Sequence, residues 1–290
     1  MHRAGLAVLA LLTLAPSEQP SFVVPDSPDL TIRTQTTLTG AVHWAITLRL
    51  KGARQSFERA YDGLATPSVD WHITQCDRQR TVIVNPASRT YADLPIDDPS
   101  LSARVEGTVL RHEDGASPRP HITVDAVDTG ERKRFGPLTA RHVVTTTTTE
   151  IPGSPASHIT MTQDGWYVDL PPQGCIEWGS TEFMATGFIS STHVVVSSPT
   201  ITRLGRAKRG FPLSEQIRRV TAEGTSIEKT ALVEISDRPI DPAVFEVPDG
   251  YRPALRLWGG GFDITRPDTL VNRALLVWEQ ASGFARRLWQ

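Results

Sequence analysis

The segment Trp44-Ala45-Ile46-Thr47-Leu48-Arg49-Leu50 alternates apolar and polar residues, and this period of two predicts a β-strand with one buried face. Ile46, Leu48 and Leu50 would share that face, because successive side chains of a strand point to opposite sides. The preceding segment Thr31–Thr36 has the same alternation. The pattern therefore predicts neighbouring strands of a sheet that is buried on one side.

The same signature recurs along most of the chain, with few long helical periods, which favours a mainly β fold built on an antiparallel sheet. Because the alternation is one-sided, one face would meet a core or a ligand and the other would meet water. Further strands are predicted at 55–61, 70–75, 80–85, 89–94, 121–127, 131–135, 138–151, 157–162, 166–170, 192–197, 201–204, 215–223 and 226–235. Tight turns are predicted at 51–52, 76–79, 86–88, 128–130, 163–165 and 224–225.

One long amphipathic helix is predicted near the C-terminus. Thr265 and Asp268 resemble a capping box, and Pro267 suits a first helical turn. The apolar residues that follow have helical spacing, namely Val271, Ala274, Trp278, Ala281, Ala285 and Leu288. Residues 267–289 would pack on the sheet, contact a partner protein, or lie on a membrane surface. A weaker helical pattern spans 176–188.

The first fifteen residues have the layout of a signal peptide, with a cationic start, an apolar run and small residues at the end. We expect residues 1–15 to be this leader and 16–29 a flexible linker. A β-rich domain at 30–255, with a flexible insert at 96–120, precedes a glycine-rich joint and helix at 256–290. The protein is therefore expected to be exported, either periplasmic or extracellular. No cysteine follows the apolar run, so no lipoprotein anchor is expected.

Cys76 and Cys175 are the only two cysteines. In an oxidising compartment they are a candidate disulfide, and the alternative is two separate buried thiols. The bridge would close a loop of roughly 100 residues, which is worth about 4–5 kcal/mol in the chain-entropy model.

Composition and motifs favour a binding protein over an enzyme. The net charge of −2 argues against nucleic-acid binding, which normally requires a basic surplus. No serine-nucleophile or phosphate-loop motif is present. The histidines lie singly and lack the spacing of metal ligands, so no catalytic residue, metal or cofactor is expected, and a histidine-dependent enzyme is a minor alternative. Besides His2 of the leader, they are His43, His72, His112, His121, His142, His158 and His193.

Four aromatic residues are the candidates for a ligand pocket. Trp44, Trp71, Tyr91 and Trp166 lie in alternating strands, so they would line one face, either as a pocket wall or as ordinary core. The basic run at 203–210 is interpreted as a solvated loop, with binding of an anionic head group as the alternative.

Several segments together resemble exported bacterial proteins of unknown function that are related in architecture to the LolA/LolB lipoprotein-carrier half-barrel. They are Arg80–Asn85 followed by Thr90–Pro95, then Phe135–Val143, Asp164–Pro171 and Asp241–Tyr251. The resemblance covers residues 30–252 and implies a strongly curved antiparallel sheet, with no catalytic residue. Gly136 and Gly250 fit positions that need unusual backbone angles.

The expected function is the non-enzymatic binding of a lipid or another hydrophobic molecule in the concave sheet. The alternative is a structural or interaction module with a filled core, which docks a partner through its C-terminal helix.

Overall fold

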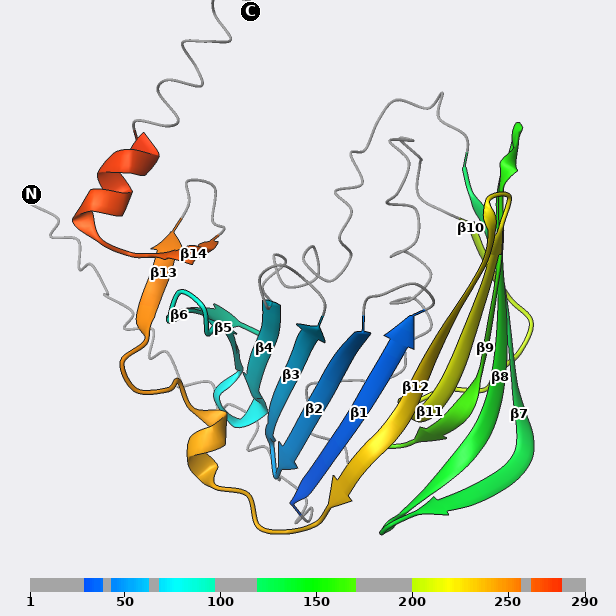
Figure 1. Cartoon of the computed structure of the whole chain (residues 1–290), viewed down its shortest axis with the longest axis horizontal. Coiled ribbons are helices and arrows are strands. Elements are labelled where there is room, and N and C mark those ends of the chain that lie inside the picture. Colours follow the sequence, from blue (N-terminus) through cyan, green and yellow to red (C-terminus); the bar gives the residue numbers. More distant parts are fainter. Residues whose placement is uncertain are drawn as a thin grey trace, which may run out of the picture.

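A computed structural model describes residues 29–38, 43–62, 68–96, 119–170, 200–256 and 262–277. Within these ranges the protein is mainly β, with one strongly curved sheet of 14 strands and a helix near the C-terminus (Figure 1). The order across the sheet is β10-β7-β8-β9-β11-β12-β1-β2-β3-β4-β5-β6-β13-β14. The mainly β class and the C-terminal helix are confirmed.

The first half of the chain supplies β1 (Leu30–Leu38), β2 (His43–Lys51), β3 (Arg54–Asp62), β4 (Ser68–Gln75), the short 3-10 helix η1 (Cys76–Arg78), β5 (Arg80–Asn85), β6 (Thr90–Pro95), β7 (His121–Phe135) and β8 (Leu138–Ile151). The second half supplies β9 (Ser154–Val168), β10 (Thr200–Arg203), β11 (Phe211–Thr221), β12 (Gly224–Ser236), η2 (Pro242–Phe245), β13 (Arg252–Arg256) and β14 (Phe262–Pro267).

Neighbouring strands are antiparallel except at two places near the edges of the sheet. There β10 runs parallel to β7 and β13 runs parallel to β6, because longer connections rather than hairpins lead into β10 and β13. The N-terminal strand β1 lies in the middle of the sheet, paired with β2 on one side and with β12 on the other.

The turn predicted at Asp128-Thr129-Gly130 is wrong, because β7 runs on to Phe135. The Asp128 carboxylate accepts a hydrogen bond from the Gly130 N–H (2.9 Å), as the sequence implies, and Gly130 has φ +85°. These residues form a bulge, across which the pairing with β8 shifts between Asp128 and Arg132. The chain reverses later, at residues 136–137, where Gly136 has the positive φ expected for it (+53°).

The turn predicted at Gln163-Asp164-Gly165 is also wrong, because β9 continues through it. Gly165 serves the close approach of β11: a Cβ at this position would lie 2.6 Å from the Ser214 carbonyl oxygen. At the hairpin between β11 and β12, the turn lies at residues 222–223, and Gly224 is already the first residue of β12. A glycine can thus mark a close contact inside a sheet as well as a turn.

The helix occupies residues 270–277 of the described chain, and its N-cap is Thr269 rather than the predicted Thr265. The Thr269 hydroxyl accepts a hydrogen bond from the Asn272 N–H (3.2 Å). Thr265 belongs to β14, where its hydroxyl donates to Asp263 (2.6 Å), so it is not available as a cap. The helix lies beside β13 and β14 (Figure 1). The described residues include no helix with the length and apolar character needed to cross a bilayer.

Buried apolar residues form separate clusters on the two faces of the sheet. We call the face that carries Leu48 the inner face and the opposite one the outer face. On the inner face, Leu48 of β2 and Ala140 of β8 belong to one cluster, although four strands separate them in the sheet order. The cluster is continuous because the strands between them, β1, β12, β11 and β9, each contribute apolar residues to it. The members of this inner cluster are Leu30, Ile32, Leu48, Leu50, Ala140, Val168, Phe211 and Leu213.

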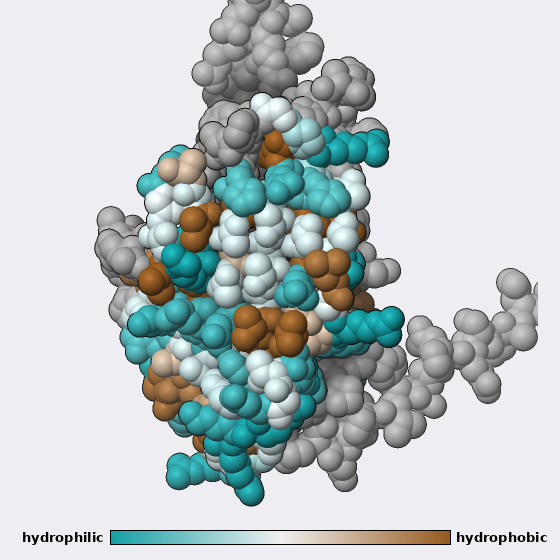
Figure 2. Space-filling model, turned by 90° about the vertical axis from the view of Figure 1, so that its right-hand side faces the viewer, coloured by the Kyte–Doolittle hydropathy of each residue, from teal (hydrophilic) through white to brown (hydrophobic). Residues whose placement is uncertain are grey.

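The outer face of β7, β8 and β9 carries mostly hydroxyl and charged residues. Figure 2 shows this side as pale and teal residues with only scattered brown ones. Thr123, Thr148 and Thr160 are register partners here on three neighbouring strands. This part of the outer face therefore has the character expected of a surface that meets water.

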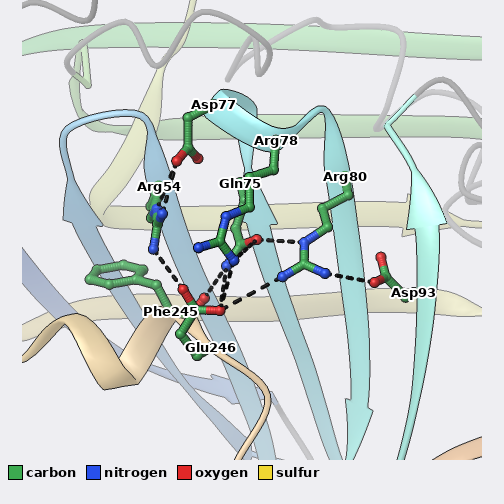
Figure 3. Close-up of polar contacts among 8 residues, drawn as sticks. All are labelled: Arg54, Gln75, Asp77, Arg78, Arg80, Asp93, Phe245 and Glu246. Carbon is green, nitrogen blue, oxygen red and sulfur yellow. Dashed lines mark hydrogen bonds and ion pairs between the residues drawn. The ribbon is translucent and has the colours of Figure 1, made fainter.

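The apolar cluster of the outer face, which we call the outer cluster, consists of Ile73, Val82, Val84, Ile240 and Phe245. Its last two members belong to residues 237–251, which we call the strap. Phe245 of the strap is fully buried against Ile73 and Val82 of the sheet. The Glu246 carboxylate fixes the strap to the sheet through the guanidinium groups of Arg54 (2.8 Å) and Arg78 (3.0 Å), as Figure 3 shows.

Several expectations lie outside the described residues. These are the leader, most of the linker, residues 97–118 of the insert with His112, Cys175, the helical pattern at 176–188, the strand at 192–197 with His193, residues 257–261 of the glycine-rich joint and the helical pattern after residue 277.

Candidate functional site

The inner face changes from apolar to polar along its strands. In β11 the alternate residues Phe211, Leu213, Glu215 and Ile217 are all buried, so the same alternation places a carboxyl group within an apolar row. Polar residues of neighbouring strands and of the segment before β11 form a band beside the inner cluster, which we call the polar belt. It consists of Thr34, Thr36, Arg59, Thr145, Gln163, Tyr167, Arg209, Glu215, Arg219, Glu228 and Thr230.

Glu215 is the most buried carboxyl group of the belt. Its Oε1 atom accepts hydrogen bonds from the Tyr167 hydroxyl and from Gln163 Nε2 (3.4 Å), and it lies 3.7 Å from a terminal nitrogen of Arg209. Burial raises the pKa of Glu215, although Tyr167 and Arg209 stabilise its ionised form. Burial and the neighbouring Glu215 likewise raise the pKa of Tyr167, so its hydroxyl acts as a donor.

A second group of charges surrounds Glu228 of β12. Burial raises the pKa of Glu228, the charge of Glu215 raises it further, and the guanidinium groups of Arg219 and Arg59 oppose this. Burial also lowers the pKa of Arg219. The belt thus contains three guanidinium groups, of Arg59, Arg209 and Arg219, and two carboxyl groups with raised pKa values. The sum of the charges within the belt is therefore positive.

The buried side-chain atoms of the belt that have no hydrogen-bond partner within the described ranges of the chain include the following four. They are Arg59 Nε, Arg209 Nε, Gln163 Oε1 and Thr145 Oγ1. Leaving a buried polar atom unpaired costs about 1–3 kcal/mol, so such atoms are usually satisfied by water or by a ligand. The belt can therefore accept a molecule that both donates and accepts hydrogen bonds.

The four predicted pocket aromatics do not line one face, so that prediction is wrong. Trp44 is a register partner of Tyr61 on the inner face, whereas Trp71 is a register partner of Glu58, which points to the outer face. Trp71 and Tyr91 pack in the outer cluster beside the strap. The hairpin registers decide this, because a shift of one residue exchanges the two faces.

Trp71 and Trp166 have polar as well as apolar neighbours, and they form no common wall. The Trp71 indole N–H donates to Ser56 (3.0 Å). Trp166 stacks on His142 of β8, with ring centroids 5.0 Å apart, and contacts Phe135. Trp44 is therefore the one predicted pocket aromatic that the registers place on the inner face.

His142 lies between a hydroxyl and a carboxylate. Its Nδ1 is 3.1 Å from the Thr129 hydroxyl and its Nε2 is 2.7 Å from an Asp164 oxygen. A hydrolase would also need N–H donors beside the hydroxyl, but those of Gly130 and Glu131 are engaged by Asp128 and by Thr129 itself. The arrangement can hold the imidazole in place, but it lacks the donors that stabilise an oxyanion. Within the described ranges no group of three His, Cys, Asp or Glu residues could hold a metal ion.

A cleft of about 270 Å³ lies beside the strap, lined by Lys51, Ala53, Arg54, Asp77, Pro242 and Phe245. Its cationic side chains already have acidic partners, since Lys51 pairs with Asp29 (2.7 Å) and Arg54 pairs with Asp77 (2.9 Å). The cleft therefore holds less unmet charge than the polar belt.

Sequence reasoning missed Glu215 and misjudged Arg209. A signal for Glu215 existed, because it stands in the apolar register of β11. Arg209 belongs to the basic run interpreted as a solvated loop, yet it is only 6% exposed and faces Glu215. Its ion pair joins residues of no shared motif, so only the fold could identify it.

Cys76 is buried at 1% exposure directly after β4, and Cys175 lies outside the described ranges, so the bridge between them stays a prediction. Comparison with known proteins finds no family model and no curated protein that matches this chain.

Proposed function

We propose that this protein is an exported, non-enzymatic binding protein that holds a hydrophobic or amphiphilic small molecule on the inner face of its curved sheet. One observation carries the proposal: the buried, unpartnered polar atoms of the belt lie on the same face as the inner apolar cluster. A ligand with an apolar part and a polar end has the chemistry to meet both regions.

Native mass spectrometry of the protein purified from its own host tests this proposal. We expect a mass above that of the polypeptide, and release of a lipid-sized molecule on collisional activation. A mass that equals the polypeptide alone, together with no binding of added lipids, would contradict a carrier role.

The alternative function is an interaction module that docks a partner through its C-terminal helix. The observation that favours it is the exposure of Leu270 (83%) and Val271 (69%) on helix 270–277. A Leu270→Ser, Val271→Ser double variant tests it better than truncation at Gly259, which would also remove β14 and its pairing with β13. Loss of one defined partner from crosslinked host extracts, with the sheet still folded, would favour this function.

Export is part of the proposal and rests on the leader-like first fifteen residues. In an oxidising compartment we propose that Cys76 and Cys175 form a disulfide, since they are the only two cysteines. Fractionation of the host, with the N-terminus of the mature protein determined by sequencing, tests the proposed export.

A further inference from the structure

We propose that the polar belt binds the anionic head group of an amphiphile, with Arg59 as the cation in contact with it. This inference rests on the proposed function and goes further by naming the chemistry of the ligand. It assigns a carboxylate or phosphate to the belt and an acyl chain to the apolar part of the inner face.

Arg59 has no ion pair within the described part of the chain, and Asp70, its register partner on β4, accepts a hydrogen bond from the Tyr61 hydroxyl (3.1 Å) instead. The only hydrogen bond from Arg59 to a described side chain goes from a terminal nitrogen to the neutral phenol of Tyr61 (3.3 Å). The Arg59 Nε is buried and has no hydrogen-bond partner in the described part of the chain. Glu228, the carboxyl group that interacts with it electrostatically, also interacts with Arg219. The charge of Arg59 is therefore available to an anion, and a guanidinium binds carboxylates and phosphates with paired N–H donors.

The surroundings of Arg59 favour an amphiphile over a free anion. The guanidinium lies over the ring of Phe57, 5.5 Å from its centroid. Phe57 in turn packs against the inner apolar cluster. A head group at Arg59 would thus have the partly exposed ring of Phe57 beside it, against which an attached chain could pack. Trp44 and Tyr61, whose ring centroids are 6.3 Å apart, lie on the same face and can cover part of that chain.

The buried charges of the belt disfavour a cationic head group, although the exposed Asp70 lies opposite Arg59 on β4 at the edge of the belt. Three guanidinium groups face two carboxyl groups, and burial makes those carboxyl groups harder to ionise. A second cation here would raise the repulsion, whereas an anion lowers it and satisfies buried N–H groups.

The experiment measures binding of matched probes to the full chain after export. Hexadecanoate and hexadecanol have the same chain and differ in the charge of the head. Vesicles of phosphatidylglycerol offer an anionic phosphate in place of the carboxylate, and vesicles of phosphatidylcholine are their zwitterionic control. The test variant is Arg59→Gln, and the control is Arg218→Gln on the exposed outer face of β11. Circular dichroism and thermal unfolding verify that each variant folds.

We expect the unmodified protein to bind hexadecanoate about tenfold more tightly than hexadecanol, or to extract phosphatidylglycerol about tenfold more readily than phosphatidylcholine. A factor of about ten corresponds to the free energy of one charge-assisted hydrogen bond. Arg59→Gln should abolish this preference and leave hexadecanol binding unchanged, while Arg218→Gln should keep it. If Arg59→Gln does not fold, Arg59→Lys keeps the charge and should keep the preference. Equal binding of charged and neutral probes, or a preference that survives Arg59→Gln, would overturn the inference and leave the proposed function standing. Binding of none of the probes would overturn both.

Discussion

Glu215 illustrates how one residue can differ from the pattern around it. It occupies a position in β11 where its neighbours on the same face are Leu213 and Ile217. An ionisable group placed there must be paired, must change its pKa, or must do both. Here Tyr167 donates to the carboxyl group, Arg209 lies beside it, and burial still raises its pKa.

The raised pKa of Glu215 has a consequence for stability. A carboxyl group whose folded-state pKa lies above its ordinary value of 4.5 favours folding below about pH 4.5. That contribution is lost as the pH rises through the folded-state pKa. We therefore expect Glu215→Gln to reduce the decline in unfolding free energy above pH 4.5, because an amide does not titrate.

Denaturant unfolding between pH 4.5 and 8 measures this effect. Glu223→Gln, at the exposed hairpin between β11 and β12, is the matched control and should follow the unmodified protein. Parallel stability profiles for Glu215→Gln and the unmodified protein would contradict the prediction.

For single residues, the sequence predicted a side-chain hydrogen bond correctly but not the backbone conformation that results from it. The Asx interaction of Asp128 with Gly130 forms as expected, but it forms a bulge in β7 instead of a hairpin. Which face Trp71 occupies depends on the register that β4 takes with β3, and no local pattern specifies that register. Arg209 and Arg59 become members of one belt because the order β3-β2-β1-β12-β11 places β3 and β11, which begins just after Arg209, in one sheet, and no local pattern specifies that order.

Among the elements, β9 and β11 approach each other closely at Gly165. A Cβ there would lie 2.6 Å from the Ser214 carbonyl oxygen and 2.9 Å from the Glu215 Cα, both backbone atoms that cannot move aside cheaply. We expect Gly165→Ala to lower the free energy of unfolding by about 1–3 kcal/mol through overpacking.

Gly153→Ala is the control, because a Cβ at Gly153 meets no atom within 4 Å and only its φ of +79° is strained. Hydrogen exchange should show faster amide exchange in β9 and β11 of Gly165→Ala and no such change in Gly153→Ala. Unchanged exchange in both strands would show that the close approach is not needed.

The strap depends on an ionised Glu246. Burial alone would raise the pKa of Glu246, but the hydrogen bond from Gln75 and the charges of Arg78 and Arg54 outweigh it and hold the pKa below its ordinary value. This contribution is present above about pH 4.5 and is lost as the pH falls through the folded-state pKa.

We expect Glu246→Gln to cost about 1 kcal/mol at pH 7, since solvent screens these partly exposed ion pairs. The difference from the unmodified protein should disappear in acid. Unfolding at pH 7 and pH 3 measures it, with Glu234→Gln as the control at an exposed position of β12. An equal cost at both pH values would point to packing rather than charge.

The elements themselves followed from the alternation of apolar residues. The strand predicted at Leu138–Ile151 agrees with β8 at both ends. The errors concern the turns between strands. The period of two identifies a strand, but it does not show whether a glycine within that strand forms a turn or allows a neighbouring strand to approach closely. The C-terminal helix is predicted correctly, but Thr265 lies in β14 and the N-cap residue is Thr269.

For the molecule as a whole, the disulfide is the most direct prediction. We expect the exported protein to be about 2 Da lighter than its reduced form, with a Cys76–Cys175 linked peptide after digestion. Reduction should lower stability, by up to about 4–5 kcal/mol in the chain-entropy model. Cys76→Ala should abolish both effects of reduction, and alkylation of two thiols in the untreated exported protein would contradict the bridge.

The central position of β1 also sets an order for folding. Thr31 pairs with Ser236 and Leu38 pairs with Glu228. One edge of β1 therefore stays unpaired until β12, about 200 residues later in the chain, has been synthesised. Contacts between residues so far apart in sequence form slowly, because a long loop must close first. A chain of this topology stays incomplete while it is being synthesised, and an incomplete chain is the form that can be threaded through a secretion pore. For the export proposed above, the same pairing that completes the sheet would delay folding until the whole domain has crossed.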